Sequence, residues 1–351
     1  MMDTFIRPVV DPLTLCSYAL LAFIIGLLLT PWFCRFQKKY KLGKKMRVKS
    51  MDGTDSPVFL KYHEHKLGTP TMGGILIWIA VIVTILLSRG LAHYGLIDFS
   101  LLQRSEVYLP LFTLTAMGIL GMVDDYFNIR GLGKNRGLDA IPKLVTMFAI
   151  AIAGAWWFYD KLEYSAVTMP ITGQVIDLGW GYIPLFILVV ASVANAVNFT
   201  DGLDGLAGGL LIFAYAAYGV IAYLMGLTVL AAFCAVVVGA TGAFLWNNVP
   251  KALFYMGDTG SMALGGCLAV IAMMTDQLMV LPIVGIVFLV ELLSVIIQLT
   301  SKRLRGGKKV FRSAPIHHHF EALDWGESKV TMRFWIVGII GAIGGVLIAL
   351  M

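Results

Sequence analysis

Charge is scarce in this sequence: Asp, Glu, Lys and Arg make up only 14% of its 351 residues, against about 25% in soluble domains. Cysteine is rare as well, with four residues and no Cys-x-x-Cys pair, so the sequence indicates neither a disulfide framework nor a zinc site. Low-complexity segments, short repeats and a linker to a second domain are also missing. Hydrophobic residues, in contrast, make up 58% of the chain. This composition predicts a polytopic membrane protein.

The N-terminal residues lack the basic stretch and the small-residue cleavage site of a secretory signal peptide. We therefore expect the first apolar run to remain as a helix. With no boundary signal elsewhere, we expect one transmembrane domain over residues 1–351.

Ten apolar runs approach the roughly 20 residues that a helix needs to cross a bilayer. They predict an all-α fold with ten transmembrane helices. The predicted spans are residues 15–34, 71–91, 107–123, 143–159, 182–199, 206–225, 227–246, 261–275, 279–300 and 332–350.

The basic residues are distributed unevenly over the connections between these spans. Arg7, Arg89, Arg104 and Lys161 lie at the N-terminus or in or beside the even-numbered connections, and all other Lys and Arg residues lie in or beside the odd-numbered ones. Cytoplasmic connections are the ones enriched in Lys and Arg. We therefore expect the odd connections to be cytoplasmic and both termini to lie on the outer side.

A polar stretch, Asn195–Gly209, separates two long apolar runs. It carries two carboxamides, Asn195 and Asn198, and two carboxylates, Asp201 and Asp204. Such groups are costly where hydrocarbon meets water unless they serve a function. A polar turn with an N-cap aspartate is the alternative, but four such side chains within ten residues favour a functional site.

Three more carboxylates fall on the same predicted face: Asp124 and Asp125 end the third span, and Asp258 begins the eighth. A solvated helix end and an N-cap are the alternatives for the pair and for Asp258. Oxygen ligands without Cys or spaced His favour Mg²⁺ or Mn²⁺ over zinc. Mg²⁺ binds one or two carboxylates together with substrate phosphates, so a diphosphate substrate at the membrane surface fits this cluster.

Half of the six histidines are consecutive, as His317, His318 and His319. Three consecutive histidines cannot all face one metal from a helix. The functional interpretation is that they donate hydrogen bonds to phosphates or orient a neighbouring group. The alternative is an ordinary polar loop. Glu291 and Gln298 lie inside the ninth span. An intramembrane Glu suggests function, although we favour a buried, protonated or paired interhelical group here.

Lys66 and Lys143 flank the first two polar clusters. Binding of substrate phosphates is one interpretation, and attraction to anionic lipid headgroups is the other.

Taken together, these motifs resemble those of the phospho-N-acetylmuramoyl-pentapeptide transferases, within the polyprenyl-phosphate N-acetylhexosamine-1-phosphate transferase superfamily. The resemblance covers nearly the whole chain. The superfamily shares the Asp-Asp pair and the Asn-x-x-Asp-Gly-x-Asp-Gly stretch at residues 198–205, whereas Gly68-Thr-Pro-Thr-Met-Gly-Gly74 and Ala314-Pro-Ile-His-His-His319 point to this family. It implies ten transmembrane helices, both termini outside, a homodimer, and a bacterial inner-membrane protein with a cytoplasmic active site.

The resemblance also implies the reaction. UDP-MurNAc-pentapeptide donates phospho-MurNAc-pentapeptide to undecaprenyl phosphate, which gives lipid I and UMP in peptidoglycan synthesis, with Mg²⁺ as cofactor. Membrane lipids surround such an enzyme, and no nucleic acid is expected as a partner.

Carried over by motif, Asp258 resembles the metal ligand, Asp124 the residue that prepares the lipid phosphate, and Asp125 its catalytic neighbour. The positions implied in substrate binding are Lys66, Lys143, Asn195, Asn198, Asp201, Asp204, Asn248, Tyr255, Gln298, His317, His318 and His319. Two features depart from the family pattern: Tyr255 stands where Phe is more frequent, and the loop over residues 52–63 is longer than usual.

Two rival functions are weighed against this one. A polyprenyl-phosphate GlcNAc-1-phosphate transferase of another surface-polymer pathway would share the carboxylates, but the His triplet and the Thr-Pro-Thr motif argue against it. A transporter would place its ionisable groups near the membrane midplane on interrupted helices, whereas here they gather at one surface. A scaffolding role for cell-wall enzymes is compatible with either enzyme.

Overall fold

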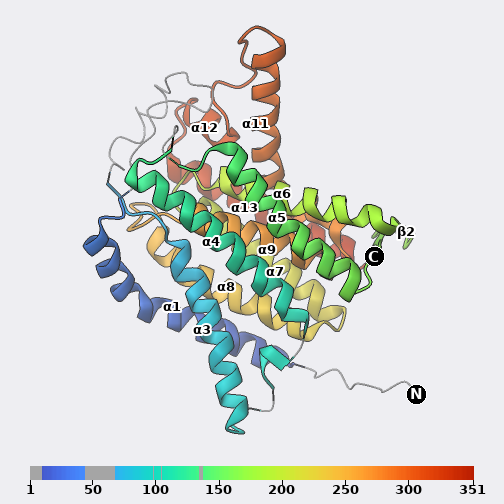
Figure 1. Cartoon of the computed structure of the whole chain (residues 1–351). Coiled ribbons are helices and arrows are strands. Elements are labelled where there is room, and N and C mark those ends of the chain that lie inside the picture. Colours follow the sequence, from blue (N-terminus) through green and yellow to red (C-terminus); the bar gives the residue numbers. More distant parts are fainter. Residues whose placement is uncertain (1–9, 44–67, 98, 104, 134–136) are drawn as a thin grey trace.

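Helices form at all ten positions where apolar runs predict them (Figure 1). The computed structural model describes residues 10–43, 68–97, 99–103, 105–133 and 137–351. The α-helices are α1 (Pro12–Tyr40), α3 (Gly74–His93), α4 (Tyr108–Arg130), α5 (Ala140–Trp156), α6 (Tyr182–Thr200), α7 (Leu206–Leu224), α8 (Thr228–Asn248), α9 (Asp258–Met274), α10 (Leu281–Val284), α11 (Ile286–Leu304), α12 (Ile316–Glu321) and α13 (Glu327–Ala349). Short helical turns are η2 (Leu101–Gln103), η3 (Ser105–Val107), η4 (Trp157–Lys161), η5 (Gly179–Gly181) and η6 (Leu278–Val280).

Eight helices in the described part of the chain are long and apolar enough to cross a membrane. The segment Leu278–Val284 and α11 qualify only together, as a pair bent by 83°. The remaining apolar helix, α9, has 17 residues. The chain is therefore an α-helical, multi-pass membrane protein.

The span predicted over residues 279–300 is wrong as one straight helix. Gly285 has φ −98° and ψ 28°, outside the helical region, and α11 leaves the preceding helix at 83°. Glycine tolerates such a break at low cost because it carries no Cβ. Figure 1 shows the result: the carboxyl-terminal part of α11 projects beyond the rest of the bundle.

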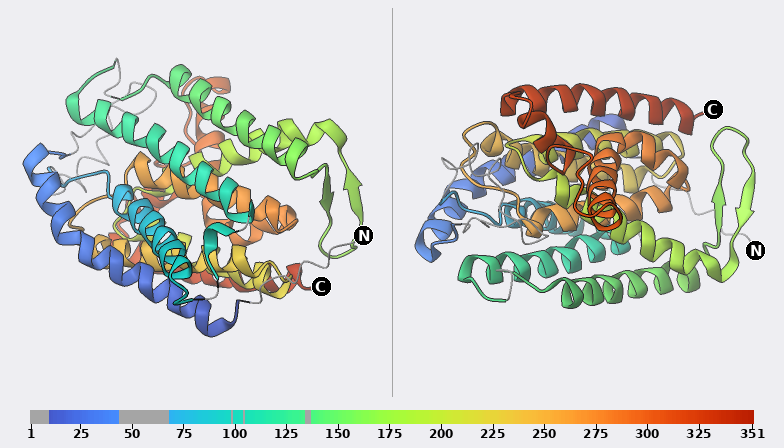
Figure 2. Two further views of the ribbon diagram at one scale, coloured as in Figure 1. Left: turned by 60° about the horizontal axis from the view of Figure 1, so that its bottom comes forward. Right: turned by 90° about the horizontal axis from the view of Figure 1, so that it is seen from above.

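A small hairpin, which the all-α prediction missed, connects α5 and α6 (Figure 2). Strands β1 (Ala166–Thr168) and β2 (Val175–Asp177) pair antiparallel. The amide of Thr168 donates to Asp276 Oδ1 at 3.2 Å, which ties the hairpin to the end of α9. Strands of three residues are too short to produce a recognisable alternation of polar and apolar residues.

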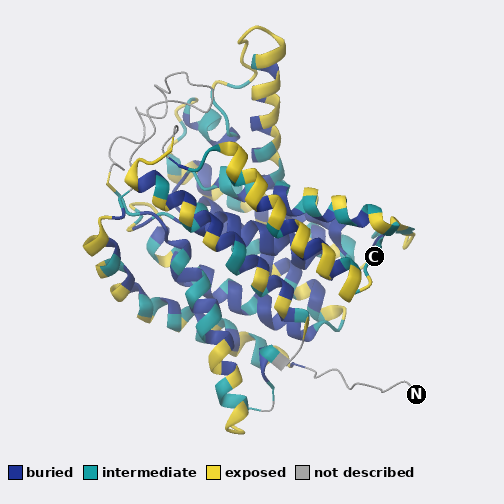
Figure 3. Cartoon of the chain, viewed as in Figure 1, coloured by how far each residue is buried: buried dark blue, intermediate teal, exposed yellow. Residues whose placement is uncertain are grey.

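Helix α9 forms the centre of the bundle. Every residue from Thr259 to Met274 is buried, and α4 and α6 pack along it (Figure 3). At 1.5 Å per residue its length is about 25 Å, less than the roughly 30 Å of hydrocarbon. Because protein surrounds α9 on all sides, its all-round apolar sequence is that of a core helix.

Glycines bring the backbones of α3 and α4 against the first turn of α9. A Cβ on Gly121 would lie 2.1 Å from the carbonyl oxygen of Asp258, and a Cβ on Gly74 would lie 2.1 Å from the amide nitrogen of Gly260. Only glycine permits this approach at either position. The close contact places Asp258 beside the carboxyl-terminal part of α4, where Asp124 and Asp125 lie.

The first and last helices begin and end away from these carboxylates. The amide of Val10, just before α1, donates to Thr228 Oγ1 at the start of α8 at 3.4 Å. A Cβ on Gly345, near the end of α13, would lie 3.1 Å from Val280 in η6. Both contacts are at the end of the bundle opposite Asp258.

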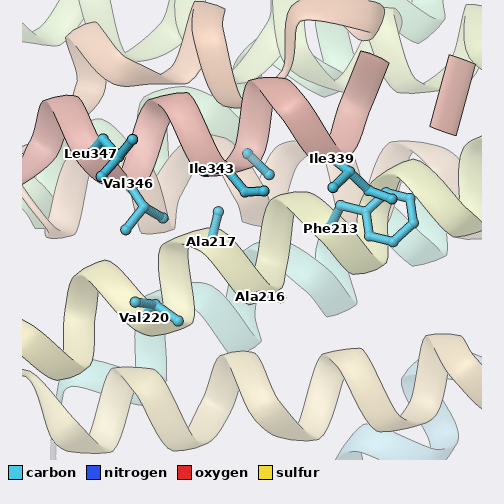
Figure 4. Close-up of a pocket in the computed structure, with 9 residues that line it drawn as sticks. Phe213, Ala216, Ala217, Val220, Ile339, Ile343, Val346 and Leu347 are labelled. Atoms are coloured by element: carbon cyan, nitrogen blue, oxygen red, sulfur yellow. The ribbon is translucent and has the colours of Figure 1, made fainter. Parts of the chain in front are cut away.

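A groove of about 320 Å³ opens between α7 and α13 (Figure 4). Its lining is wholly hydrophobic and runs from Phe213 and Ile339 at one end to Val220 and Leu347 at the other. Such a surface suits hydrocarbon and has no polar side chain that could bind a polar ligand. The groove is therefore separate from the polar site described below.

Candidate functional site

Three connections meet at one end of the bundle: the described residues 131–133 and 137–139 between α4 and α5, 201–205 between α6 and α7, and 249–257 between α8 and α9. Each follows a helix that runs toward this end. The polar residues that end α4 and α6 therefore meet those that begin α5 and α9.

The centre of the site is a cation held between two carboxylates. The ammonium of Lys143, in the first turn of α5, donates to Asp258 and lies 3.5 Å from Asp124 Oδ2. Asp124 Oδ1 accepts from the amide of Leu138 at 2.7 Å. The side chains of Lys143 and Asp258 are 20% and 19% exposed, and that of Asp124 is 7% exposed. Water and small solutes can therefore reach the ammonium and Asp258.

Asn198 fixes the orientation of Asp258. Its Nδ2 donates to Asp258 Oδ1 at 2.8 Å and lies 2.9 Å from Ser261 Oγ. Ser261 in turn donates to the carbonyl of Gly257 at 2.9 Å. One carboxylate oxygen of Asp258 thus faces Asn198, and the other faces Lys143.

Asp125 and Asp201 hold the amino-terminal end of α9. The amide and hydroxyl of Thr259 donate to Asp125 Oδ2 at 3.0 and 2.7 Å, and the amide of Gly257 donates to Asp201 Oδ2 at 3.0 Å. Amides in this part of a helix have no partner within the helix, and carboxylates there are stabilising. These two aspartates position Asp258 through the backbone on either side of it.

Gly257 must be glycine in this arrangement. Its φ is 71°, and a Cβ would lie 2.4 Å from Asp125 Oδ2. A side chain would therefore separate Asp125 from α9 and strain the backbone.

Asp204 and Asn248 are buried and join the loops rather than face the central cluster. Asp204 Oδ2 accepts from Ala252 N at 3.1 Å, and the amide of Asp204 donates to Glu327 at 2.7 Å. Asn248 accepts from the amide of Gly205 at 3.0 Å and donates to a carbonyl of the 249–257 connection at 2.9 Å. Both residues hold the connections that carry Asp201 and Gly257.

The backbone of Tyr255 joins the Gly-Thr-Pro-Thr motif to the site. Its amide donates to the carbonyl of Pro70 at 2.8 Å, and its carbonyl accepts from Gly73 N at 2.7 Å. The Tyr255 side chain is half-buried. Lys66 and the loop over residues 52–63 lie outside the described residues.

Two predicted substrate-binding residues lie away from the centre. Asn195 donates to the carbonyl of Ala191 at 2.8 Å, within its own helix. Gln298 accepts from the amides of Val310 and Phe311, both at 3.0 Å. Gln298 therefore fastens the connection between α11 and α12 to α11.

The three histidines take three different partners. His317 Nδ1 lies 3.1 Å from a carboxylate oxygen of Glu291, and His318 Nδ1 lies 2.6 Å from Glu321. His319 Nδ1 accepts from a backbone amide in the preceding loop. Across the described residues, no group of three or more His, Cys, Asp or Glu side chains is arranged to hold a metal ion.

Glu291 has a buried partner, which is one of the two forms that the sequence favoured. Glu291 and His317 are both fully buried. Burial works to lower the pKa of His317, but the Glu291 carboxylate, with smaller contributions from Glu321 and Glu327, outweighs it and raises that pKa above its ordinary value. Folding therefore stabilises the imidazolium form of His317 relative to the unfolded chain.

Sequence reasoning missed several residues of the site. Ser261 follows Asp258 by three residues, a helical spacing that would have been a usable signal. Glu327 and Leu138 contribute through contacts distant in sequence, and no local pattern marks them.

The central cluster fits a divalent cation. Asp258 and Asp124 come from different helices and already hold a cation, the Lys143 ammonium. Hard oxygen ligands of this kind suit Mg²⁺, which needs only one or two carboxylates when substrate phosphates complete its coordination.

Known proteins resemble this chain over nearly its whole length. Residues 107–276 match the family described as glycosyl transferase family 4, a range that contains Asp124, Lys143, Asn198 and Asp258. A phospho-N-acetylmuramoyl-pentapeptide-transferase of Chloroflexus aurantiacus is 40% identical over 342 residues, which cover 94% of this chain and 88% of the relative. Proteins of the same name from Geobacillus sp. (strain WCH70) and Syntrophus aciditrophicus are also 40% identical, covering 94% and 93% of this chain and 96% and 89% of the relatives.

Proposed function

The chain belongs to the phospho-N-acetylmuramoyl-pentapeptide-transferase family, and we propose that it transfers phospho-MurNAc-pentapeptide from UDP-MurNAc-pentapeptide to undecaprenyl phosphate. The products are lipid I and UMP, in peptidoglycan synthesis. The observation that carries this proposal is the cluster of Asp124, Lys143 and Asp258 at one end of a membrane-spanning bundle. It is a site for phosphates and a divalent cation at the surface where a lipid phosphate would lie.

The reaction requires positioning and charge neutralisation more than covalent chemistry by the protein. An oxygen of the acceptor phosphate bonds to the sugar-bearing phosphorus of the donor, and the anhydride bond to UMP breaks. One phosphoanhydride replaces another, so no external energy source is needed. The acceptor phosphate is already anionic at neutral pH, so a strong general base is not required.

The residues of the site divide these tasks. Asp258, with Asp124 beside it, would hold Mg²⁺, which neutralises phosphate charge when bound. Asn198 keeps one oxygen of Asp258 in place. Lys143 has the charge and exposure to bind the donor diphosphate. Asp125 and Asp201 hold the first turn of α9 in the position that these contacts require.

We further propose ten crossings of a bacterial inner membrane, with the site on the cytoplasmic face and both termini outside. In this arrangement α9 crosses inside the protein, and α10 with α11 makes one bent crossing. The distribution of charge supports it. Among the described residues, the end opposite the site carries only Arg89 and Lys161 of the Lys and Arg residues. The site end carries Arg35, Lys38, Lys39, Lys41, Arg130, Lys143, Lys251, Lys302, Arg303, Arg305, Lys308, Lys309, Arg312, Lys329 and Arg333.

A homodimer within the lipid bilayer is the oligomeric state that we propose, from the family resemblance. Size-exclusion chromatography with light scattering on the detergent-solubilised protein tests it, and a monomer at all concentrations would contradict it.

The function is tested with purified, detergent-solubilised protein. It receives undecaprenyl phosphate and UDP-MurNAc-pentapeptide, with and without Mg²⁺, and UDP-GlcNAc is offered in parallel. We expect Mg²⁺-dependent release of UMP with the muramoyl donor alone. Release of UMP from UDP-GlcNAc instead would assign the chain to a GlcNAc-1-phosphate transferase pathway.

A further inference from the structure

Lys143 occupies the position between the carboxylates of two helices. Its ammonium binds Asp258 at the start of α9 and lies 3.5 Å from Asp124 on α4. Asp258 and Asp124 are the carboxylates that the proposed function gives to the divalent cation. The ammonium and a divalent cation therefore depend on the same oxygen atoms.

Two cations cannot share these oxygens at low cost. Like charges a few ångströms apart repel strongly where water is largely excluded. A cation that binds Asp258 and Asp124 must therefore displace the Lys143 ammonium, or it binds with much lower affinity.

The carboxylates are held in place, whereas the ammonium is free to leave. Asp124 accepts from the amide of Leu138, and Asp258 accepts from Asn198. These contacts remain if Lys143 moves. Lys143 has a flexible four-carbon stem and a side chain that is 20% exposed, so it can turn toward the solvent side without leaving the site.

We propose that Lys143 is an exchangeable internal cation. Its ammonium neutralises Asp124 and Asp258 in the substrate-free protein, and it moves to the donor diphosphate when a divalent cation binds these two carboxylates. This inference rests on the proposed function and deepens it. The metal and the donor then assist each other, because the donor attracts the ammonium that the metal must displace. Such a coupling is reciprocal and typically amounts to a 5- to 150-fold change in affinity.

The experiment measures Mn²⁺ binding to the full-length, detergent-solubilised protein by electron paramagnetic resonance. Mn²⁺ is used because it binds the same oxygen ligands as Mg²⁺ and is directly visible. Wild type, Lys143→Met and Lys143→Arg are compared with and without UDP-MurNAc-pentapeptide, in the absence of acceptor lipid. Lys161→Met is the control, since Lys161 forms an exposed pair with Asp160 at the other end of the bundle.

We expect Lys143→Met to bind Mn²⁺ about tenfold more tightly than wild type without donor. Donor should tighten Mn²⁺ binding to both proteins, because its phosphates complete the coordination of the metal, but by a clearly larger factor in wild type than in Lys143→Met. Lys143→Arg keeps the positive charge and should bind Mn²⁺ as weakly as wild type. Lys161→Met should behave as wild type throughout.

The outcomes separate this inference from the function on which it rests. Unchanged or weaker Mn²⁺ binding by a folded Lys143→Met protein, with binding still lost on Asp258→Asn, would overturn the exchange and leave the metal site standing. Absence of Mn²⁺ binding in every variant, with and without donor, would overturn both the exchange and the metal role of Asp258. The transferase reaction itself is decided separately by UMP release.

Discussion

His317 and Glu291 form a fully buried pair, with Nδ1 of the imidazole 3.1 Å from the carboxylate. The pair joins α12, which carries the His triplet, to the membrane-embedded helix α11. The opposite nitrogen, Nε2, faces Gly202, where a Cβ would lie only 2.3 Å away. The pair therefore supports the 201–205 connection, whose Asp201 holds the start of α9.

Glu291→Gln should reduce stability in a pH-dependent way. The pKa of His317 is raised above its ordinary value of 6.5, so the stabilisation is fully present below pH 6.5 and is lost as the pH rises through the folded-state pKa. The difference in melting temperature between wild type and Glu291→Gln should thus be largest at acidic pH. Thermal unfolding between about pH 5.5 and 8.5 measures it. The exposed Glu163, changed to Gln, is the control; an equal difference at every pH would contradict the charged pair.

Gly202→Ala should push the imidazole of His317 out of place. Overpacking of this kind costs about 1–3 kcal/mol of unfolding free energy. Adding His317→Ala should recover part of that loss, so a double-mutant cycle should be non-additive. Gly90→Ala is the matched control, because no atom lies within 4 Å of a Cβ there. Strict additivity of the two changes would show that Gly202 and His317 do not press on each other.

Gly121→Ala should separate α4 from α9 and so inactivate the site. The added methyl group would meet the Asp258 carbonyl at 2.1 Å, and backbone cannot yield as a side chain can. We expect a loss of about 1–3 kcal/mol in stability together with loss of UMP release. Gly118→Ala, one turn earlier, meets nothing closer than 3.4 Å and should retain activity. Equal activity of both variants would remove the close contact from any role in the site.

Asp258→Asn should leave the fold intact and remove Mg²⁺-dependent turnover, because an amide is a much weaker ligand for Mg²⁺ than a carboxylate. We expect UMP release to fall by at least about 100-fold while the melting temperature changes little. Asp160→Asn, in the exposed pair with Lys161, serves as the control. Turnover near the wild-type rate with an unchanged Mg²⁺ requirement would remove Asp258 from the metal role.

Asp125→Asn and Asp125→Ala should differ. Asn keeps an oxygen that can accept from the amide and hydroxyl of Thr259, whereas Ala leaves both donors unsatisfied. We expect Asn to retain substantial activity and stability, and Ala to lose about 1–3 kcal/mol of unfolding free energy and most of its activity. If both variants are equally inactive and equally stable, Asp125 acts in the chemistry and not as a support of α9.

The sequence predicted the helices well because hydrophobic length is a strong local signal. Its errors came from features that depend on neighbours or on single residues. The run over residues 279–300 is apolar on both sides of Gly285, so hydropathy could not report the 83° break. The burial of α9 was equally hidden, since a core helix and a lipid-facing helix have similar composition.

At the site, the sequence predicted the chemistry of the residues better than their individual tasks. Asp124 and Asp125 are adjacent and look alike, yet one faces Lys143 and the other binds Thr259. The difference follows from the roughly 100° between successive residues of a helix, and which of them faces α9 depends on tertiary packing. For the same reason the sequence could not separate Asp201, which binds a backbone amide of the α9 turn, from a substrate contact.

The enclosure of α9 bears on the order in which the protein is built during synthesis. Its main neighbours, α4 and α6, both precede it in the chain, so they can be in the membrane before α9 emerges. Because α9 is enclosed mainly by helices that precede it in the chain, most of its packing partners are available by the time it is synthesised. Asp258 enters with its first turn and meets Lys143 and Asp124 only then. A chain interrupted before residue 258 thus carries Asp124 and Lys143 but not the carboxylate that pairs with them, and residues that support the site loops, such as Glu327, follow later still.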